Sequence, residues 1–208
     1  MELDVTRVAG VTGHALMQRR VAVLFAREDS NYKAMPGCNV YDAQRDARSW
    51  PGGEPCIAHP PCRGWGRLRG MANPDPGEEA NAVWAVRQVR TWGGVLEHPS
   101  LSTLWKCCKM AEPGQRDQWG GWCHPIMQSW FGHKAEKGTW LYIVGAEPDE
   151  LPGTPLSLEW PTHTVSTNSK YKRLPELSKA LREHTPPTLA AWLVEVARRT
   201  RQKPRPVW

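Results

Sequence analysis

The feature that most constrains this sequence is a series of short apolar runs, each of strand length and each ended by polar residues, proline or glycine. Val21–Ala26 is the clearest of them, and a continuous run of this kind indicates a strand buried on both faces. Further runs follow at Asn39–Tyr41, Pro55–Ala58, Val95–Leu96 and Trp140–Gly145. Buried strands that alternate with helical stretches predict an α/β sandwich with a mainly parallel sheet.

Two stretches have helical spacing. Glu78–Trp92 repeats its valines on one face and is followed by two glycines, as expected where a helix ends. Thr188–Arg199 is amphipathic, and we expect Thr185 to cap its N-terminus with Pro186 at the first helical position. No period holds between residues 107 and 133, so the sequence predicts no element there.

These patterns divide the chain into one principal domain and its attachments. The predicted parts are an N-terminal lead-in at 1–20, an α/β core at 21–145, a loop-rich insert at 146–180, a closing helix at 181–200 and a basic tail at 201–208.

Composition narrows the class of protein. The net charge of +6 favours a polyanionic partner such as nucleic acid. Without a membrane-spanning run or a secretory leader, we expect a cytoplasmic protein that keeps its six cysteines as free thiols. The twelve tryptophans, against two phenylalanines, are consistent either with core packing or with stacking on nucleic-acid bases.

Chemically competent side chains follow three of the predicted strands. Asp42 comes directly after one strand, Cys62 lies just past another beyond Pro60 and Pro61, and Glu97 ends a third. The carboxyl ends of parallel strands meet at one edge of a sheet, where α/β proteins bind their ligands. An inert, half-buried cysteine would be the ordinary interpretation of Cys62 alone. In this company it becomes a candidate nucleophile.

Six segments, taken in chain order, resemble the motifs of one enzyme family. They are Leu24–Ala26 (the family's LFAG strand end), Tyr41–Trp50 (its acidic strand tip), Pro60–Trp65 (its PCQ loop), Leu96–Pro99 (its ENV motif), Lys134–Gly145 (its QxRxR segment) and Glu183–Ala190 (its GNAVPPxLA helix). In these segments the chain resembles the DNA cytosine-5 methyltransferases. The resemblance spans residues 21–199 and implies a single-domain Rossmann-like methyltransferase sandwich, truncated relative to the family.

The resemblance implies three catalytic residues. Cys62 would attack carbon 6 of a pyrimidine, which makes carbon 5 nucleophilic enough to take up a one-carbon group. Glu97 would protonate or hydrogen-bond ring N3. Lys137 would partly replace the paired arginines of the family, which this sequence lacks.

The resemblance also implies residues that bind the donor and the nucleic acid. Phe25, Ala26, Asp42 and Thr185 would bind S-adenosyl-L-methionine or a modified one-carbon donor. The modified donor is considered because residues 27–31 contain none of the family's glycines. The partner is expected to be DNA or a cytosine nucleotide, and its contacts would come from a basic and aromatic loop after the nucleophile: Arg63, Trp65, Arg67 and Arg69.

Other interpretations remain open from sequence. A thymidylate-synthase-like enzyme also attacks pyrimidine carbon 6 with a cysteine, and a methyltransferase homologue that only binds DNA would explain the missing glycines. A zinc site could be assembled from His98, Cys107, Cys108, Cys123 and His124. Adjacent cysteines do not give the usual ligand spacing, however, so we expect no metal.

Overall fold

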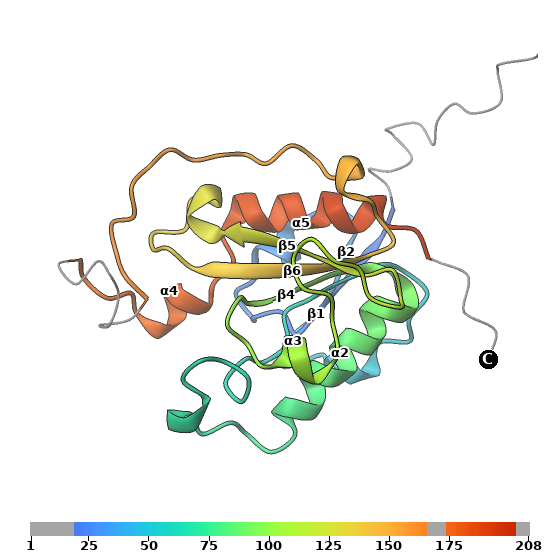
Figure 1. Ribbon diagram of the computed structural model, residues 1–208, viewed down its shortest axis with the longest axis horizontal. Coiled ribbons are helices and arrows are strands. Elements are labelled where there is room, and N and C mark those ends of the chain that lie inside the picture. The colour runs from blue at the N-terminus through green and yellow to red at the C-terminus, as the bar shows by residue number, and fades with distance from the viewer. Residues whose placement is uncertain (1–18, 166–173, 203–208) are drawn as a thin grey trace, which may run out of the picture.

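Six strands form one mixed sheet in the computed structural model, which describes residues 19–165 and 174–202 (Figure 1). The strands are β1 (Val21–Leu24), β2 (Cys38–Tyr41), β3 (Cys56–Ala58), β4 (Gly94–Pro99), β5 (Trp122–Met127) and β6 (Gly138–Val144). They lie in the order β2-β1-β3-β4-β6-β5. The first four are parallel, and β6 runs antiparallel to both of its neighbours.

Helices cover both faces of the sheet. The α-helices are α2 (Glu78–Trp92), α3 (Leu104–Cys107), α4 (Lys179–Glu183) and α5 (Pro187–Arg199). Short 3-10 helices connect them: η1 (Asn31–Ala34), η2 (Ala47–Ser49), η3 (Arg69–Met71), η4 (Gln128–Phe131) and η5 (Pro148–Glu150). Figure 1 shows α5 on one side of the sheet and α2 with α3 on the other. The mixed α/β architecture with a mostly parallel sheet is confirmed, and it is compatible with a Rossmann-like fold.

Alternation along each strand builds two hydrophobic cores. In β1, Val21 and Val23 pack in the cluster that contains α5, whereas Ala22 and Leu24 pack in the cluster that contains α2. All four side chains are fully buried. Because successive side chains of a strand point to opposite faces, a continuous apolar run is what a sheet covered on both sides requires.

The topology places a switch point between β1 and β3. The chain passes from β1 outward to β2 and then returns to the other side of β1 to form β3. Connections therefore leave the ends of these two strands in opposite directions, which opens the edge of the sheet between them. The loops after β1, β3 and β4 meet there.

Two expectations about local structure were wrong. Residues 107–133 are not irregular, because β5 and η4 lie within them. Pro125 interrupts the apolar pattern of β5, and it is tolerated because β5 is an edge strand. The cap of α5 is Pro186 rather than Thr185, with Pro187 at the first helical position, so the helix begins without a side-chain cap.

The expected insert at 146–180 is largely irregular where it is described. It contains η5, the first residues of α4 and two isolated bridges, which join Ala135 to His163 and Thr164 to Glu176. Of the expected basic tail, residues 203–208 lie outside the described ranges, as do residues 1–18 of the lead-in. Within the described ranges, no helix combines the length and apolarity needed to cross a membrane.

Candidate active site

A buried carboxylate lies at the centre of the strand ends. Glu97 belongs to β4, and its side chain is only 12% exposed. One oxygen, Oε1, accepts a hydrogen bond of 2.9 Å from Nε2 of Gln128, which also lies 3.1 Å from Oγ1 of Thr139. The other oxygen lies 3.2 Å from Nδ1 of His59, the residue that follows β3. The pairing of β3 with β4 is what makes His59 a neighbour of Glu97.

The charges around Glu97 keep it ionised. Burial alone raises the pKa of its carboxyl, but the Lys137 ammonium and the His59 ring outweigh burial and lower the pKa to about 2. The carboxylate thus accepts hydrogen bonds and carries no proton near neutral pH. His98, the next residue, points to the other core, where burial lowers its pKa to about 4 and its ring packs edge-on against Trp105.

A buried tyrosine extends this hydrogen-bonded chain. The hydroxyl of Tyr32, in η1, lies 3.0 Å from Nε2 of His59, and its side chain is almost completely buried. Burial raises the pKa of Tyr32 well above its ordinary value, and the nearby Glu97 charge adds to the effect. Tyr32 therefore stays protonated and can donate to Nε2 in the tautomer of His59 that carries a proton on Nδ1, which is also the tautomer that donates to Glu97.

The Cys62 thiol interacts electrostatically with the Glu97 carboxylate and the Lys137 ammonium. It is accessible at the surface of the loop after β3, four residues past the end of the strand. Desolvation by the surrounding protein raises the pKa of its thiol, the Glu97 and Glu183 carboxylates raise it further, and the Lys137 ammonium lowers it. The side chain of Cys62 is therefore a thiol at rest. Of the three residues predicted to be catalytic, Cys62 and Lys137 each interact electrostatically with Glu97.

Lys137 links this cluster to the closing part of the chain. It directly precedes β6, and its Nζ donates a hydrogen bond of 3.1 Å to the carbonyl of Arg182 in α4. The ammonium thus neutralises the carboxylate of Glu97 while it holds α4 near the site.

Three of the four residues predicted to bind the donor lie at the ends of β1 and β2, and the fourth, Thr185, lies just before α5. Phe25 directly follows β1 with a φ of +60°, and its ring packs edge-on against Trp84. The backbone N–H of Ala26 donates to the carbonyl of Tyr41. Asp42 is buried, and one of its oxygens accepts backbone N–H groups from residues 44 and 45.

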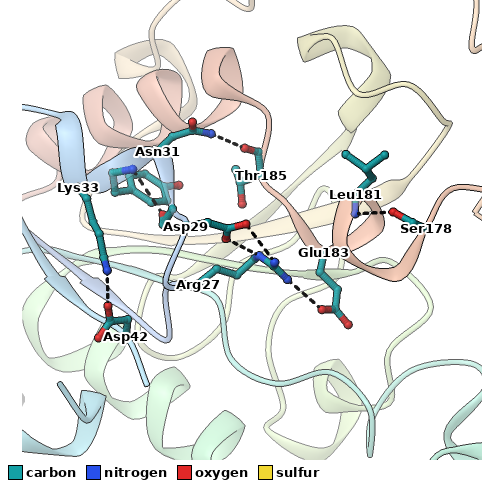
Figure 2. A network of polar contacts seen from close by, with 11 residues as sticks. Arg27, Asp29, Asn31, Lys33, Asp42, Ser178, Leu181, Glu183 and Thr185 are labelled. Carbon is teal, nitrogen blue, oxygen red and sulfur yellow. Dashed lines mark hydrogen bonds and ion pairs between the residues drawn. The ribbon is translucent and has the colours of Figure 1, made fainter. Parts of the chain in front are cut away.

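Polar contacts fix the loop after β1, where the motif resemblance predicts glycines (Figure 2). Nζ of Lys33 lies 2.5 Å from Oδ2 of Asp42, and this contact is the main reason why the pKa of Asp42 is lowered. Arg27 pairs with Asp29 at 2.8 Å and with Glu183 at 3.1 Å. Asn31 donates a hydrogen bond of 2.8 Å to the carbonyl of Thr185. We call the two ion pairs of Arg27 together with this hydrogen bond the latch.

The four residues predicted to contact nucleic acid divide into two pairs. Arg63 forms ion pairs with Glu78 and, at 2.6 Å, with Asp75, so it closes the base of its own loop. Trp65 is half-buried against the core that contains α2, and its carbonyl accepts the N–H of Thr103. Arg67 and Arg69 are exposed at the loop tip beside two exposed apolar side chains, Leu68 and Met71.

The cysteine and histidine residues considered for zinc do not form a site. Cys123 and His98 are buried, Cys107 is exposed, and His124 lies between the rings of Trp122 and Trp192. In the part of the chain that the structure describes, no group of three potential ligands could hold a metal ion.

Sequence reasoning missed His59, Tyr32, Gln128 and Thr139. His59 had a local signal, since it directly precedes Pro60 and Pro61 at the strand end. The other three carry no local pattern, and only tertiary contacts bring them to Glu97.

Comparison with protein-family models and with curated protein sequences finds no match for this chain. What the fold and the site define is therefore a class: a mixed α/β protein that holds an accessible thiol and an ionised carboxylate at the carboxyl edge of its sheet.

Proposed function

We propose that this protein is a cytosine-C5-modifying enzyme that forms a covalent adduct between Cys62 and carbon 6 of the pyrimidine ring. The observation that carries the proposal is the ionised, hydrogen-bonded carboxylate of Glu97 within electrostatic reach of Cys62 and Lys137. This pairing of a thiol with a carboxylate at strand ends is the arrangement that the motif resemblance implies.

The reaction begins with addition to the ring. The Cys62 thiol loses its proton to solvent, its sulfur forms a bond to carbon 6, and the π electrons of the C5–C6 bond make carbon 5 nucleophilic. Carbon 5 then forms a bond to the electrophilic carbon of the donor, and the bond between that carbon and its leaving group breaks, with the electron pair going to the leaving group. Carbon 5 loses its hydrogen as a proton to solvent, and the electrons of that C–H bond re-form the C5–C6 double bond and expel the thiolate of Cys62. Lys137 favours the thiolate, since its charge lowers the pKa of Cys62.

Glu97 offers the base only hydrogen-bond acceptors in the resting protein. An ionised carboxylate only accepts hydrogen bonds, and its pKa of about 2 keeps it ionised. It can accept a hydrogen bond from the 4-amino group of cytosine or from the N3–H of uracil, so the carboxylate alone does not separate the two bases. Protonation of cytosine N3, which the resemblance implies, requires Glu97 to take up a proton when the base binds.

The sheet order supports the methyltransferase-like assignment. The order β2-β1-β3-β4 equals that of a doubly wound sheet, 3-2-1-4-5-6, from which the outer third strand is missing. The chain is too short between β2 and β3 to supply that strand, since only residues 42–55 separate them. A truncated Rossmann-like sandwich accounts for both features.

The residues at the donor position do not fit S-adenosyl-L-methionine as they stand. The resemblance assigns the ribose hydroxyls to Asp42, but Lys33 and two backbone N–H groups already occupy its carboxylate. The latch fills the position of the missing glycine loop with side chains (Figure 2). We therefore assign the donor only to the class of electrophilic one-carbon or related groups.

Mass spectrometry of a trapped adduct tests the proposal without the donor. The probes are an oligonucleotide and a free nucleotide carrying 2-pyrimidinone, which accepts a thiolate at carbon 6 and needs no group transfer. We expect a covalent adduct located at Cys62, its loss in Cys62→Ser, and its retention in the matched control Cys107→Ser, which changes another exposed cysteine.

The other outcomes of this experiment would favour one of the alternative functions or reject Cys62 as the nucleophile. Binding of DNA without an adduct would replace the proposal by the DNA-binding homologue. An adduct with the free nucleotide alone would favour the thymidylate-synthase-like reaction. An adduct at a different cysteine would reject Cys62 as the nucleophile.

A further inference from the structure

An exposed aromatic segment crosses the protein after η5. Residues 151–163 contain no helix or strand, yet three of their large apolar side chains face solvent: Leu156 at 63%, Leu158 at 92% and Trp160 at 83% exposure. Figure 1 shows this segment as a long arch over the side of the sheet that carries α5 and η4. Large apolar side chains that are held in solvent commonly mark a binding surface.

Two tryptophans differ from the others in how far they are exposed to solvent. Among the tryptophans that the structure describes, only Trp160 and Trp130, which is 41% exposed, face solvent to this degree. The arch and η4 lie in contact, because the N–H of Ser157 donates a hydrogen bond of 2.7 Å to the carbonyl of Trp130. Core packing accounts for the other described tryptophans except Trp119, whose ring stacks on the Arg90 guanidinium, and leaves Trp130 and Trp160 unexplained.

A small hollow lies beside Trp160. It has a volume of about 50 Å³, and its lining includes Trp160, Glu159, Ser157, His133 and Lys134. The hollow has a fixed shape, since the N–H groups of residues 162 and 163 both donate to the carbonyl of Lys134, at 2.9 and 3.0 Å. The arch is therefore tied down on both sides of Trp160.

His133 forms part of the lining of this hollow. The ring is only 7% exposed, and its Nδ1 lies 2.7 Å from the carbonyl of Ala135. Its Nε2 is buried from solvent, and the ring also interacts with the backbone of Leu181. Burial lowers the pKa of His133, so the ring is neutral and adds no charge to the hollow.

A second hollow lies on the other side of His133. It has a volume of about 150 Å³, and besides His133 and Lys134 it is lined by Leu177, Leu181, Pro186 and Pro187. An apolar cavity of that volume is known to hold one six-membered aromatic ring. The two hollows share Gly132, His133 and Lys134, so they follow one another along the surface.

We propose that the two hollows bind single-stranded nucleic acid, with one unpaired base stacked on Trp160 and a phosphate beside Lys134. Every base has a planar face that can stack on an exposed tryptophan. Lys134 is exposed between the hollows and can neutralise a phosphate. Bases stacked inside a duplex cannot reach Trp160 in this way.

The inference adds a partner to the proposed function. It names single-stranded nucleic acid as the polymer that carries the modified base, and to that extent it rests on the proposed function. The binding itself does not use Cys62, so it is measured in a protein that cannot form the adduct.

Equilibrium binding of the full-length Cys62→Ser protein tests the inference. The probes are a fluorescent single-stranded DNA of mixed sequence and the same strand in a duplex, at fixed salt. We expect Trp160→Ala to weaken single-strand binding about 5- to 150-fold, as loss of one stacked base does. Trp160→Phe should recover most of the affinity, and Lys134→Gln should lower the slope of log K against log salt by about one.

Leu158→Ala is the matched control. Leu158 lies on the same arch and is more exposed than Trp160, but it has no aromatic face. We expect this variant to change affinity less than twofold. Thermal unfolding of both variants should match that of the parent protein, because neither side chain is buried.

Three results would overturn the inference. The first is unchanged binding in Trp160→Ala. The second is an equal loss in Leu158→Ala and Trp160→Ala, which would indicate a general apolar contact in place of base stacking. The third is equal or tighter binding of the duplex. Absence of the 2-pyrimidinone adduct would reject the proposed function but would leave a Trp160-dependent affinity intact, so the two failures are distinguishable.

Discussion

At the scale of single residues, the site is organised by the charge of Glu97. Its pKa of about 2 lies below the ordinary value of 4.5, so the folded state binds its proton less tightly than the unfolded state does. The stabilisation from this shift is fully present above the pKa that Glu97 has in the unfolded chain, 4.5. It is lost as the pH falls through the pKa that Glu97 has in the folded protein, about 2. Its size is on the order of 3 kcal/mol, from 1.36 kcal/mol per pKa unit.

Glu97→Gln should therefore be less stable than the parent protein at pH 6, and the difference should shrink as pH falls from about 4.5 toward 2. Urea unfolding at pH 3 and pH 6 measures it. Glu159→Gln, which changes an exposed carboxylate, is the control and should show no such trend. A stability gap that stays constant over this pH range would contradict an ionised Glu97.

The hydroxyl of Tyr32 should be worth more than an ordinary tyrosine hydroxyl. Tyr32→Phe leaves Nε2 of His59 without its partner in a nearly buried position, at a cost of about 1–3 kcal/mol. Without this bond, His59 should hold Glu97 less firmly, so formation of the 2-pyrimidinone adduct should slow as well.

Thermal unfolding and the rate of adduct formation measure the two effects of Tyr32→Phe. Tyr41→Phe is the control, because the Tyr41 hydroxyl contacts Arg45, an exposed side chain, rather than the site. Equal losses of adduct rate in the two variants would remove Tyr32 from the site.

At the scale of elements, the latch joins the loop after β1 to the segment before α5. Its two kinds of contact should differ in strength. The Arg27–Glu183 pair is substantially exposed, at 34% and 48%, so it should contribute less than about 1 kcal/mol. The hydrogen bond from Asn31 to the carbonyl of Thr185 is half-buried, so water weakens it less than it weakens the exposed ion pair.

Hydrogen exchange should separate these contacts. Asn31→Ala should speed exchange in residues 179–186 more than Arg27→Ala does, because it frees the backbone carbonyl that anchors this segment. Mass spectrometry of peptides from this segment and from α2, which serves as the internal reference, measures the difference. Faster exchange in Arg27→Ala than in Asn31→Ala would show that the ion pair is the main restraint.

At the scale of the whole molecule, the sequence predicted the elements that have their own pattern. The buried strands, the helix at Glu78–Trp92 and the closing helix follow from periodicity, and the strand-end rule brought Cys62 and Glu97 together. β5 was missed because its mixed residues become a strand only by pairing with β6. Tyr32 and Gln128 were missed for the same reason, since their hydrogen bonds to the site span 27 and 31 residues.

The integrity of the sheet depends on one close backbone approach between its central strands. Gly94 begins β4 opposite Cys56 of β3, and it has a φ of +130°. A Cβ atom at this position would lie 1.9 Å from the backbone oxygen of Cys56, and a backbone atom cannot move aside as a flexible side chain can. Replacement of this glycine must therefore separate β3 from β4, the two strands that position His59 and Glu97.

Gly94→Ala should consequently destabilise the protein by more than about 4 kcal/mol, in the range of the most damaging single substitutions. It should also abolish adduct formation, because Cys62 follows β3 and Glu97 lies in β4. Gly70→Ala is the control, since its Cβ would meet no atom within 4 Å and its φ is not positive. Urea unfolding compares the variants, and a Gly94→Ala protein as stable as Gly70→Ala would mean that β3 and β4 are not paired in this register.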